Sequence, residues 1–333
     1  MIKNRTDMKK IFNICVMIMV GFLAVSCNDE WKDELYENYV SFNAPLNDLG
    51  VTNIYVRYQN DGLSTYQLPL IVSGTNANSN DITAKVALDP DTLAQLNIER
   101  FQNRREFYYT QMADELFEIP SYTVKIPKGS RQGLLPITFN FKDIDMFYKW
   151  ILPLTIVEGD GCIPHPRKNY KKALLRVYPF TDYSGSYQST NMSVYFRGST
   201  KNALVVNTRQ AHVVNDNTVF FYAGTVSEDD VNRYIYKVFV TFNEDGTLTV
   251  KAADDRIQLK LNEDPTYSVD SNMDAKLPYL EYRYVKLNLN YSYDDVTSVP
   301  GTSIGYDVRG NMTMVRRINT QIPDQDQAIQ WEN

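Results

Sequence analysis

The stretch LEYRYVKLNLNYSYDD, residues 280–295, alternates between two sets of side chains. Successive side chains of a β-strand point to opposite faces, so this pattern predicts a strand with two different faces. The first face, which we expect to be core beyond its first member, would carry Arg283, Val285, Leu287, Leu289, Tyr291 and Tyr293. The second face would carry Tyr282, Tyr284, Lys286, Asn288, Asn290 and Ser292. The stretch thus raises the question of which tyrosines are buried and which could contact a ligand.

The composition extends the β prediction to the whole chain. Of the 333 residues, 43% are apolar and 13% aromatic, which is enough for sizeable cores in two domains. Tyrosine, with 24 copies against 3 of tryptophan, favours pleated and half-buried surfaces. We therefore expect an all-β chain.

Short strand-like runs separated by turn residues fill residues 36–180. About seven such runs, followed by a last one, predict an immunoglobulin-like antiparallel β-sandwich. One helix interrupts them at residues 90–100, with Asp89 as its N-cap and Pro90 at its first position. The expected strands are residues 39–42, 53–58, 66–72, 82–88, 121–126, 134–139, 151–156 and 172–178.

A boundary follows at residues 179–185, PFTDYSG, where Pro and Gly interrupt the strand pattern. For residues 183–333 we expect a second antiparallel β-sandwich or a closed barrel, which periodicity does not separate. The clearest hairpin has Asp245 and Gly246 at its turn. The expected strands are residues 193–196, 203–206, 219–222, 234–242, 247–251, 282–293 and 311–317, and we expect the fourth of them to be buried on both sides.

Residues 1–26 have the pattern of an export signal. Four basic residues precede an apolar run at residues 11–25 that is too short for a membrane span. The small Ser26 precedes Cys27, as in the lipobox of bacterial lipoproteins, so we expect the Cys27 thiol to be lipidated. Residues 27–35 would then form an acidic tether. The alternative is an ordinary secretory signal followed by a chance cysteine.

Charge and cysteine content limit the partners. The chain carries a net charge of −6, and removal of the signal, whose net charge is +3, leaves about −9. Such an acidic protein is not expected to bind nucleic acid or to dock electrostatically on anionic lipid. Membrane contact would come from the lipid on Cys27. Only Cys162 would remain as a thiol, so no disulfide is expected within one mature chain.

Motifs of catalysis and metal binding do not stand out. Cys162 and His165 could ligate a metal, but two ligands in a proline-rich turn are better explained as a plain loop. Adjacent acids such as Asp294 and Asp295 would point to opposite faces of a strand, unlike the paired carboxylates of a glycosidase. We expect no catalytic residue, no metal and no cofactor, with calcium at a loop such as residues 243–246 left open.

Sugar binding needs less than catalysis does. An exposed aromatic ring stacks on the C–H face of a sugar, and polar side chains bind its hydroxyl groups. The second face of the opening stretch offers this combination in Tyr282, Tyr284, Lys286 and Asn288, and Trp331 near the C-terminus is a further candidate platform. The alternative is a solvated face whose tyrosines pair across strands.

The order of short motifs in the first domain carries a family resemblance. It runs from Val40-Ser-Phe42 through LPLIV at residues 68–72, Asn97 and Pro127-Lys-Gly129 to WILPLTI at residues 150–156. This order resembles the immunoglobulin-like domain of unknown function in Bacteroidota glycan-utilisation lipoproteins. A related domain lies at the N-terminus of some endo-β-N-acetylglucosaminidases. More weakly, residues 183–187 and 239–250 resemble the β-rich domain of unknown function that often follows it.

The resemblance implies a lipoprotein of the outer membrane that faces the cell exterior and acts with an outer-membrane glycan importer. The acids that follow Cys27 also resemble the export signal of such surface lipoproteins. We therefore expect a non-catalytic protein that binds a polysaccharide or the glycan of a glycoprotein. The alternatives are a structural, adhesion or importer-assembly component, and a glycosidase without a recognisable motif.

Overall fold

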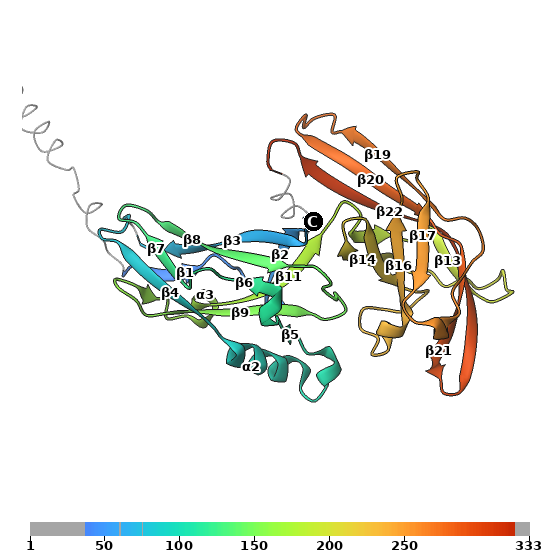
Figure 1. The fold of residues 1–333 in the computed structure, drawn as a ribbon, viewed down its shortest axis with the longest axis horizontal. Helices are drawn as coiled ribbons and strands as arrows, with labels where there is room; N and C mark the ends of the chain where they lie inside the picture. Colours follow the sequence, from blue (N-terminus) through green and yellow to red (C-terminus); the bar gives the residue numbers. More distant parts are fainter. Residues whose placement is uncertain (1–36, 60, 75, 324–333) are drawn as a thin grey trace, which may run out of the picture.

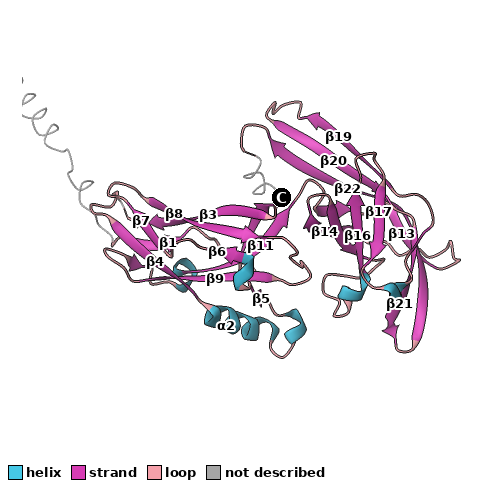
Figure 2. Cartoon of the chain, in the orientation of Figure 1, coloured by secondary structure: helices cyan, strands magenta, loops and turns pink. Residues whose placement is uncertain are grey.

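The computed structural model describes residues 37–59, 61–74 and 76–323 of the chain. They form two β-rich domains that follow one another along the chain (Figure 1). The all-β prediction is confirmed, since strands dominate and the helices are few and short (Figure 2). The predicted signal segment, Cys27, the tether and Trp331 lie outside the described residues. Within the described ranges, no helix combines the length and the apolar character that crossing a membrane requires.

The N-terminal domain is a sandwich of two sheets. The first sheet has the order β10-β1-β3-β8-β6 and the second the order β2-β11-β9-β4-β7, with β5 beside β9. The strands of the first sheet are β1 (Tyr39–Phe42), β3 (Leu63–Val72), β6 (Phe117–Glu118), β8 (Gln132–Asn140) and β10 (Ile163–Pro164). Those of the second are β2 (Thr52–Arg57), β4 (Ile82–Leu88), β5 (Thr110–Gln111), β7 (Thr123–Ile126), β9 (Trp150–Val157) and β11 (Lys172–Phe180).

Alternating burial explains why these two sheets pack face to face. Leu135, Ile137 and Phe139 of β8 are fully buried, while the residues between them are partly exposed. Burying one such side chain contributes roughly 1.5–3 kcal/mol. Three pairs depart from the antiparallel pattern, because β1 with β10, β2 with β11 and β5 with β9 run parallel. The parallel pair β2–β11 places the last strand of the domain beside one of its first.

The predicted helix is α2 (Pro90–Phe101), and it covers the outer side of the second sheet (Figure 1). The Asp89 carboxylate accepts the backbone N–H of Thr92 at 3.2 Å, as expected of an N-cap. The Asn97 side chain is buried and bonds both the N–H and the C=O of Tyr109, at 2.8 and 2.9 Å. Asn97 therefore fastens the helix to the segment that leads into β5. Short helical turns are η2 (Arg105–Phe107), η3 (Asp114–Leu116) and α3 (Lys168–Lys171).

The C-terminal domain is one eleven-stranded sheet that curls around its own core. Its main path is β17-β16-β15-β14-β12-β22-β20-β19, and the ends of that path approach each other at the bridge between Thr247 and Thr266. This contact makes it closer to the barrel than to the sandwich of the two expected forms. Its strands are β12 (Gly185–Gln188), β13 (Met192–Phe196), β14 (Thr208–Asn215), β15 (Thr218–Tyr222), β16 (Lys237–Phe242), β17 (Leu248–Ala252), β18 (Lys260–Leu261), β19 (Thr266–Met273), β20 (Leu280–Asn288), β21 (Tyr291–Val299) and β22 (Thr302–Asn319).

Residues 280–295, which the alternation predicts as one strand, form β20 and the start of β21. The break at residues 289–290 faces Gly310, where β22 changes partners from β21 to β20. The Asn290 side-chain oxygen accepts the Gly310 N–H at 2.9 Å. Gly310 has φ +126°, and a Cβ there would overlap the backbone of Asn191, so the switch requires glycine. The predicted core face is nevertheless confirmed on both sides of the break, since Val285, Leu287, Leu289, Tyr291 and Tyr293 are all at most 1% exposed.

Two of the expected strands differ from the structure. Residues 203–206 form no strand and contribute a single bridge, between Leu204 and Val194. Residues 234–242 begin as the 3₁₀ helix η4 (Arg233–Tyr236) before β16 starts. The different backbone turns Tyr234 outward, where it is 47% exposed, so the prediction that this run is buried on both sides is wrong at its start. A further 3₁₀ turn, η5 (Asp255–Ile257), precedes β18.

The two domains are packed together at their junction. Phe220 and Tyr222 of β15 belong to the core cluster of the N-terminal sandwich. One linker carboxylate, Asp182, accepts both terminal nitrogens of Arg57 at 3.0 Å and Nη1 of Arg316 at 3.1 Å. Burial opposes ionisation of Asp182, but these cations outweigh it and hold the pKa of Asp182 below its ordinary value. The linker is therefore fixed to both domains.

Candidate functional site

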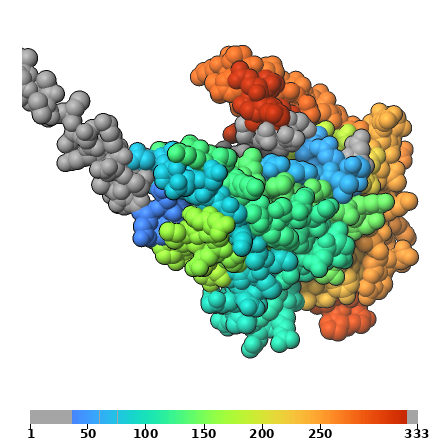
Figure 3. Space-filling model, turned by 60° about the vertical axis from the view of Figure 1, so that its left-hand side comes forward, coloured from blue at the N-terminus to red at the C-terminus, as the bar shows by residue number. Residues whose placement is uncertain are grey.

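The four predicted platform residues that the structure describes share the outer face of β20. Tyr282 and Tyr284 are half-buried, whereas Lys286 and Asn288 are exposed. The Arg317 guanidinium of β22 lies 6.0 Å from the centre of the Tyr282 ring. The hairpin of β19 and β20 that carries this face projects from the body of the molecule (Figure 3). We call these four side chains the β20 face.

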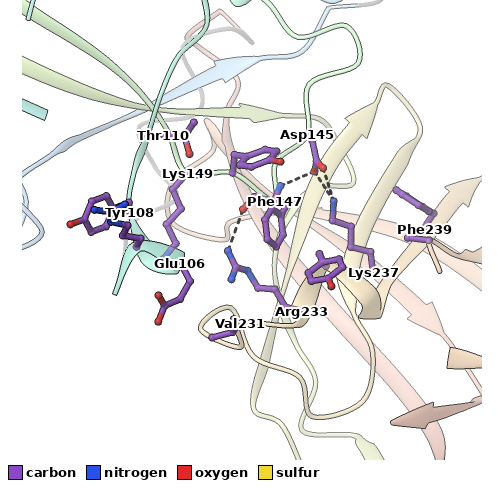
Figure 4. A pocket seen from close by; sticks show the side chains of 14 residues that line it. Glu106, Tyr108, Thr110, Asp145, Phe147, Lys149, Val231, Arg233, Lys237 and Phe239 are labelled. Carbon is purple, nitrogen blue, oxygen red and sulfur yellow. Dashed lines mark hydrogen bonds and ion pairs between the residues drawn. The ribbon is translucent and has the colours of Figure 1, made fainter. Parts of the chain in front are cut away.

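A second site, which the sequence did not predict, lies between the two domains. It is a cleft of about 650 Å³, a size typical of ligand pockets. Figure 4 shows side chains from both domains converging on it. Its lining consists of Arg105, Glu106, Tyr108, Thr110, Asp145, Phe147, Tyr148, Lys149, Val231, Arg233, Tyr234, Lys237, Phe239 and Ala253. We call it the interdomain cleft.

The N-terminal wall of the interdomain cleft comes from η2 and from the loop between β8 and β9. In that loop the Asp145 carboxylate accepts the N–H of Phe147 at 2.9 Å, which forms a tight side-chain-capped turn. The turn directs Phe147 toward the other domain, as Figure 4 shows. The opposite wall consists of η4 with the preceding Val231, of Lys237 and Phe239 at the start of β16, and of Ala253.

Aromatic rings from the two domains meet in the interdomain cleft. The Phe147 ring lies edge-on to Tyr148 at 5.3 Å and edge-on to Tyr234 at 6.1 Å between ring centres. Phe147 itself is half-buried, but Tyr148 is 45% exposed and Tyr234 is 47% exposed. One exposed tyrosine from each domain thus flanks a shared aromatic centre.

Two cations of the C-terminal domain hold Phe147 in place. The Arg233 guanidinium carbon lies 4.3 Å from the centre of the ring, and the Lys237 ammonium lies 5.2 Å from it. Lys237 also binds both Asp145 oxygens, at 2.7 and 2.8 Å. Arg233 donates to the carbonyl oxygens of Asp230 and Phe147, at 3.0 and 3.3 Å. The bonds to Asp145 and to the Phe147 carbonyl join the walls of the cleft across the domain boundary.

The charges that line the interdomain cleft are unequal. Four cationic side chains stand against two acidic ones, in a chain whose net charge is −6. Burial lowers the pKa of Lys149, and the positive charges of Arg176 and Arg233 lower it further, against the opposing effect of Asp229. The Asp229 carboxylate lies 3.8 Å from the Lys149 ammonium and is mostly exposed, so it neutralises Lys149 only weakly.

The arrangement suits binding better than acid–base catalysis. Glu106 and Asp145 both line the interdomain cleft, but the Lys237 ammonium occupies both oxygens of Asp145. Among residues 37–59, 61–74 and 76–323, no three histidine, cysteine or acidic side chains are grouped as metal ligands would be. Cys162 is buried, and burial raises its pKa to about 11. His165 accepts the Arg167 N–H at 3.1 Å, and His212 bonds Glu228 at 2.9 Å.

A cavity of similar volume, about 640 Å³, lies beside α3. Tyr170 and Phe42 are its only aromatic lining residues, and Phe42 is buried in the core. The interdomain cleft is lined by five aromatic side chains, two of them well exposed. Because sugar rings stack on exposed aromatic faces, the interdomain cleft is the better candidate of the two.

Solved structures of similar proteins place the chain in a family. A protein of unknown function from Bacteroides ovatus is 49% identical, with a TM-score of 0.79, and the match covers 87% of this chain and 98% of that one. An auxiliary nutrient binding protein from Bacteroides thetaiotaomicron is 39% identical, with a TM-score of 0.78, over 89% of this chain and all of that one. The chain belongs to this family of two-domain Bacteroides proteins.

Further comparisons agree with this membership. Another family member, of unknown function and from Bacteroides ovatus, is 32% identical with a TM-score of 0.77, over 90% of this chain and 97% of its own. The model of DUF4973, a domain of unknown function, matches residues 31–160. A model described as "-like, C-terminal" matches residues 171–313. No curated protein matches the chain.

Sequence reasoning missed the interdomain cleft because its walls are assembled from distant segments. Residues 105–110, 145–149 and 231–239 carry no shared motif, and each is short. One local signal was available, since Phe147 and Tyr148 place two aromatic residues in the loop between two strands, directly before Trp150 at the start of β9. Aromatic residues in a loop between strands are a common feature of binding surfaces.

Proposed function

We propose that this protein is a non-catalytic glycan-binding lipoprotein of the cell surface, and that it holds its ligand in the interdomain cleft. The pairing of Tyr148 and Tyr234 across the domain boundary carries this proposal. Each is nearly half exposed, each packs edge-on against Phe147, and donors on Lys149 and Arg105 lie in the same lining. A sugar ring stacks on such tyrosines while its hydroxyl groups bind the donors.

Family membership supports a nutrient ligand. The family member from Bacteroides thetaiotaomicron that is 39% identical is named an auxiliary nutrient binding protein. A polysaccharide or glycoprotein glycan captured at the cell surface for an outer-membrane importer is such a nutrient. The β20 face predicted from the sequence is a second place where the same ligand could rest, because Tyr282 and Tyr284 present half-exposed rings beside Lys286 and Asn288.

A glycan panel tests the proposal. Purified protein is titrated by calorimetry with plant and host oligosaccharides, and the best binder is repeated with Tyr148→Ala and Tyr234→Ala. Losing one stacked ring costs roughly 1–2 kcal/mol, which lowers affinity about 5- to 30-fold. Tyr282→Ala is the matched control from the β20 face. A loss confined to Tyr282→Ala would move the site to the β20 face, and no binding to any glycan would overturn the function.

The lipid anchor is a separate part of the proposal. Cys27 follows a small residue at the end of an export signal, and an acidic stretch follows it. Lipidation would hold the protein on the outer membrane with its two domains outside the cell. The Cys27→Ser variant should move from the membrane fraction to the soluble fraction, while Cys162→Ser should stay with the membrane. A membrane-bound Cys27→Ser protein would contradict the anchor.

A second candidate function rests on β19, which pairs with β20 along one edge only. Across the described residues, its other edge makes a single bridge, between Thr247 and Thr266. An open strand edge can accept a strand from another chain, which suits an assembly partner of an importer. Val269→Lys would place a charge on this exposed strand. Loss of importer co-purification with unchanged glycan affinity would favour assembly over sugar capture.

A further inference from the structure

The interdomain cleft holds positive charge that its own acidic residues do not neutralise. Of its four cationic lining residues, Lys237 is paired with Asp145 at 2.7 Å. Arg233 is 4% exposed and, within the described residues, makes no ion pair: it donates to two neutral carbonyl groups, and the Tyr222 hydroxyl and the Glu228 carboxylate are close enough to interact with its charge. A buried guanidinium with no carboxylate in direct contact favours the arrival of an anion.

Lys149 adds a second cation that is only weakly paired. Its side chain is 19% exposed, and its one ion pair within the described part of the chain is the 3.8 Å contact with Asp229, which is 81% exposed. Glu228 is the other acid that acts on Lys149, and it is bonded to His212 at 2.9 Å. Arg105 is exposed on the same wall and, in the described ranges, pairs with no acid. Lys149, Arg233 and Arg105 together leave the cleft electropositive in an acidic protein.

Glu106 also lines the cleft and reduces its excess of positive charge, because its carboxylate lies on the same wall as Arg105. Glu106 is exposed, and its ion pair is with Arg104, at 3.5 Å. Water screens such a surface pair strongly. The cations deeper in the cleft are screened less, because Arg233 and Lys149 are removed from solvent.

We infer that the ligand of the interdomain cleft is an anionic saccharide, whose carboxylate or sulfate group lies against Lys149 and Arg233 while a sugar ring stacks on Tyr148 or Tyr234. This inference rests on the proposed function and names the class of its ligand. A guanidinium and an ammonium that line the same cleft and act on each other's charge can both bind the oxygens of a carboxylate or sulfate group. The exposed tyrosines contribute the stacking that any sugar would use, so the cations are what select the charged ligand.

Matched ligand pairs test the charge directly. Oligogalacturonate is compared with its methyl ester, sialyllactose with lactose, and sulfated with desulfated chondroitin oligosaccharides, by calorimetry on the purified protein. We expect the more negatively charged member of at least one pair to bind tenfold or more tightly than its partner, and to weaken as salt rises from 50 to 300 mM. Desulfated chondroitin keeps its uronate carboxylates, so the chondroitin pair isolates the sulfate group. Preference in the chondroitin pair alone would assign the anion as sulfate, and preference in either other pair would assign it as carboxylate.

Substitutions of single lysines show which side chain produces the preference for an anionic saccharide. Lys149→Met keeps the aliphatic stem and removes the charge, so it should reduce the preference for the more charged member at least fivefold, and in the galacturonate and sialyllactose pairs it should leave affinity for the uncharged member nearly unchanged. Lys125→Met, at an exposed position of β7 that belongs to neither the interdomain cleft nor the β20 face, is the control and should change neither affinity. Circular dichroism melting confirms that both variants are folded.

Different results would overturn the anionic ligand and the glycan-binding function. Binding of neutral glycans with no preference for an anionic member, in every pair, would overturn the anionic ligand and leave the glycan-binding function standing. An anionic preference that Lys149→Met leaves intact would also overturn the inference, because the cleft cations would not be its source. Absence of binding by both neutral and anionic glycans would overturn the proposed function itself.

Discussion

Replacing Asp145 by Asn removes the carboxylate that holds the two domains together across the cleft. The Lys237 ammonium binds both Asp145 oxygens, at 2.7 and 2.8 Å, and Lys237 is 8% exposed. Asn has the same shape as Asp and its side-chain oxygen can still accept the Phe147 N–H, so the turn at residues 145–147 is kept. The change therefore isolates the ion pair.

The size of the effect follows from the unequal burial of the two partners. Removing one member of a fully buried pair costs about 3–5 kcal/mol, whereas an exposed pair contributes about 0–1 kcal/mol. Lys237 is buried, but the Asp145 side chain is 46% exposed. We therefore expect Asp145→Asn to lower the free energy of unfolding by about 2 kcal/mol. Lys237→Met should cost less, about 1 kcal/mol, because the stranded Asp145 carboxylate can hydrate.

The assay is a double-mutant cycle in urea, followed by tryptophan fluorescence, since Trp150 donates its indole N–H to the Asp145 carbonyl at 2.9 Å. The cycle of Asp145→Asn and Lys237→Met should give a coupling energy of about 1–2 kcal/mol. A coupling energy below about 0.5 kcal/mol would refute the account of the interface. So would a larger loss from Lys237→Met than from Asp145→Asn.

Three further predictions follow from other parts of the molecule. The pKa of Asp182 is held below its ordinary value, so the ionised Asp182 carboxylate stabilises the fold at neutral pH. This contribution is lost as pH falls from about 4 through the lowered pKa. In acid titrations of thermal stability, the difference between the wild-type protein and Asp182→Asn should therefore shrink below about pH 4. Gly224 has φ +55°, and a Cβ there would overlap the Tyr293 hydroxyl, so Gly224→Ala should cost about 3 kcal/mol or more in urea unfolding. Gly301→Ala, at φ +74° with nothing near its Cβ, should cost only about 1 kcal/mol, and equal losses would contradict the steric argument. Burial raises the pKa of Cys162 to about 11, so the Cys162 thiol should not react with iodoacetamide at pH 8 in the native protein and should react within minutes in urea. Labelling is measured on the peptide that contains Cys162, and rapid labelling of the native protein would contradict the burial.

The parts of the fold that local pattern determines could be predicted. The alternation in residues 282–293 correctly separated buried Val285 and Tyr291 from exposed Lys286, because side-chain direction in a strand follows position along it. It was wrong at Ser292, which lies on the second face but is buried. The N-cap at Asp89 could also be predicted from local pattern, because its hydrogen bond joins residues only three positions apart. The break at residues 289–290 was not predictable, since its cause, Gly310, lies in another strand.

Elements whose character depends on distant contacts were missed or misjudged. β14 reads TRQAHVVN and β19 reads TYSVDSNM, so both contain too many polar residues to be recognised as strands, and pairing with their neighbours forms them. Tyr234 is apolar in pattern but exposed, because η4 replaces the expected strand. The interdomain cleft depends on how two folded domains dock, and neither domain's sequence encodes that geometry on its own.

The decisive experiment is a crystal structure of the protein with its best-binding oligosaccharide. We predict a sugar ring in contact with Tyr148 or Tyr234, with an anionic substituent of the saccharide against Lys149 and Arg233. A saccharide bound on the β20 face at Tyr282 and Tyr284, with the interdomain cleft occupied by solvent alone, would contradict it.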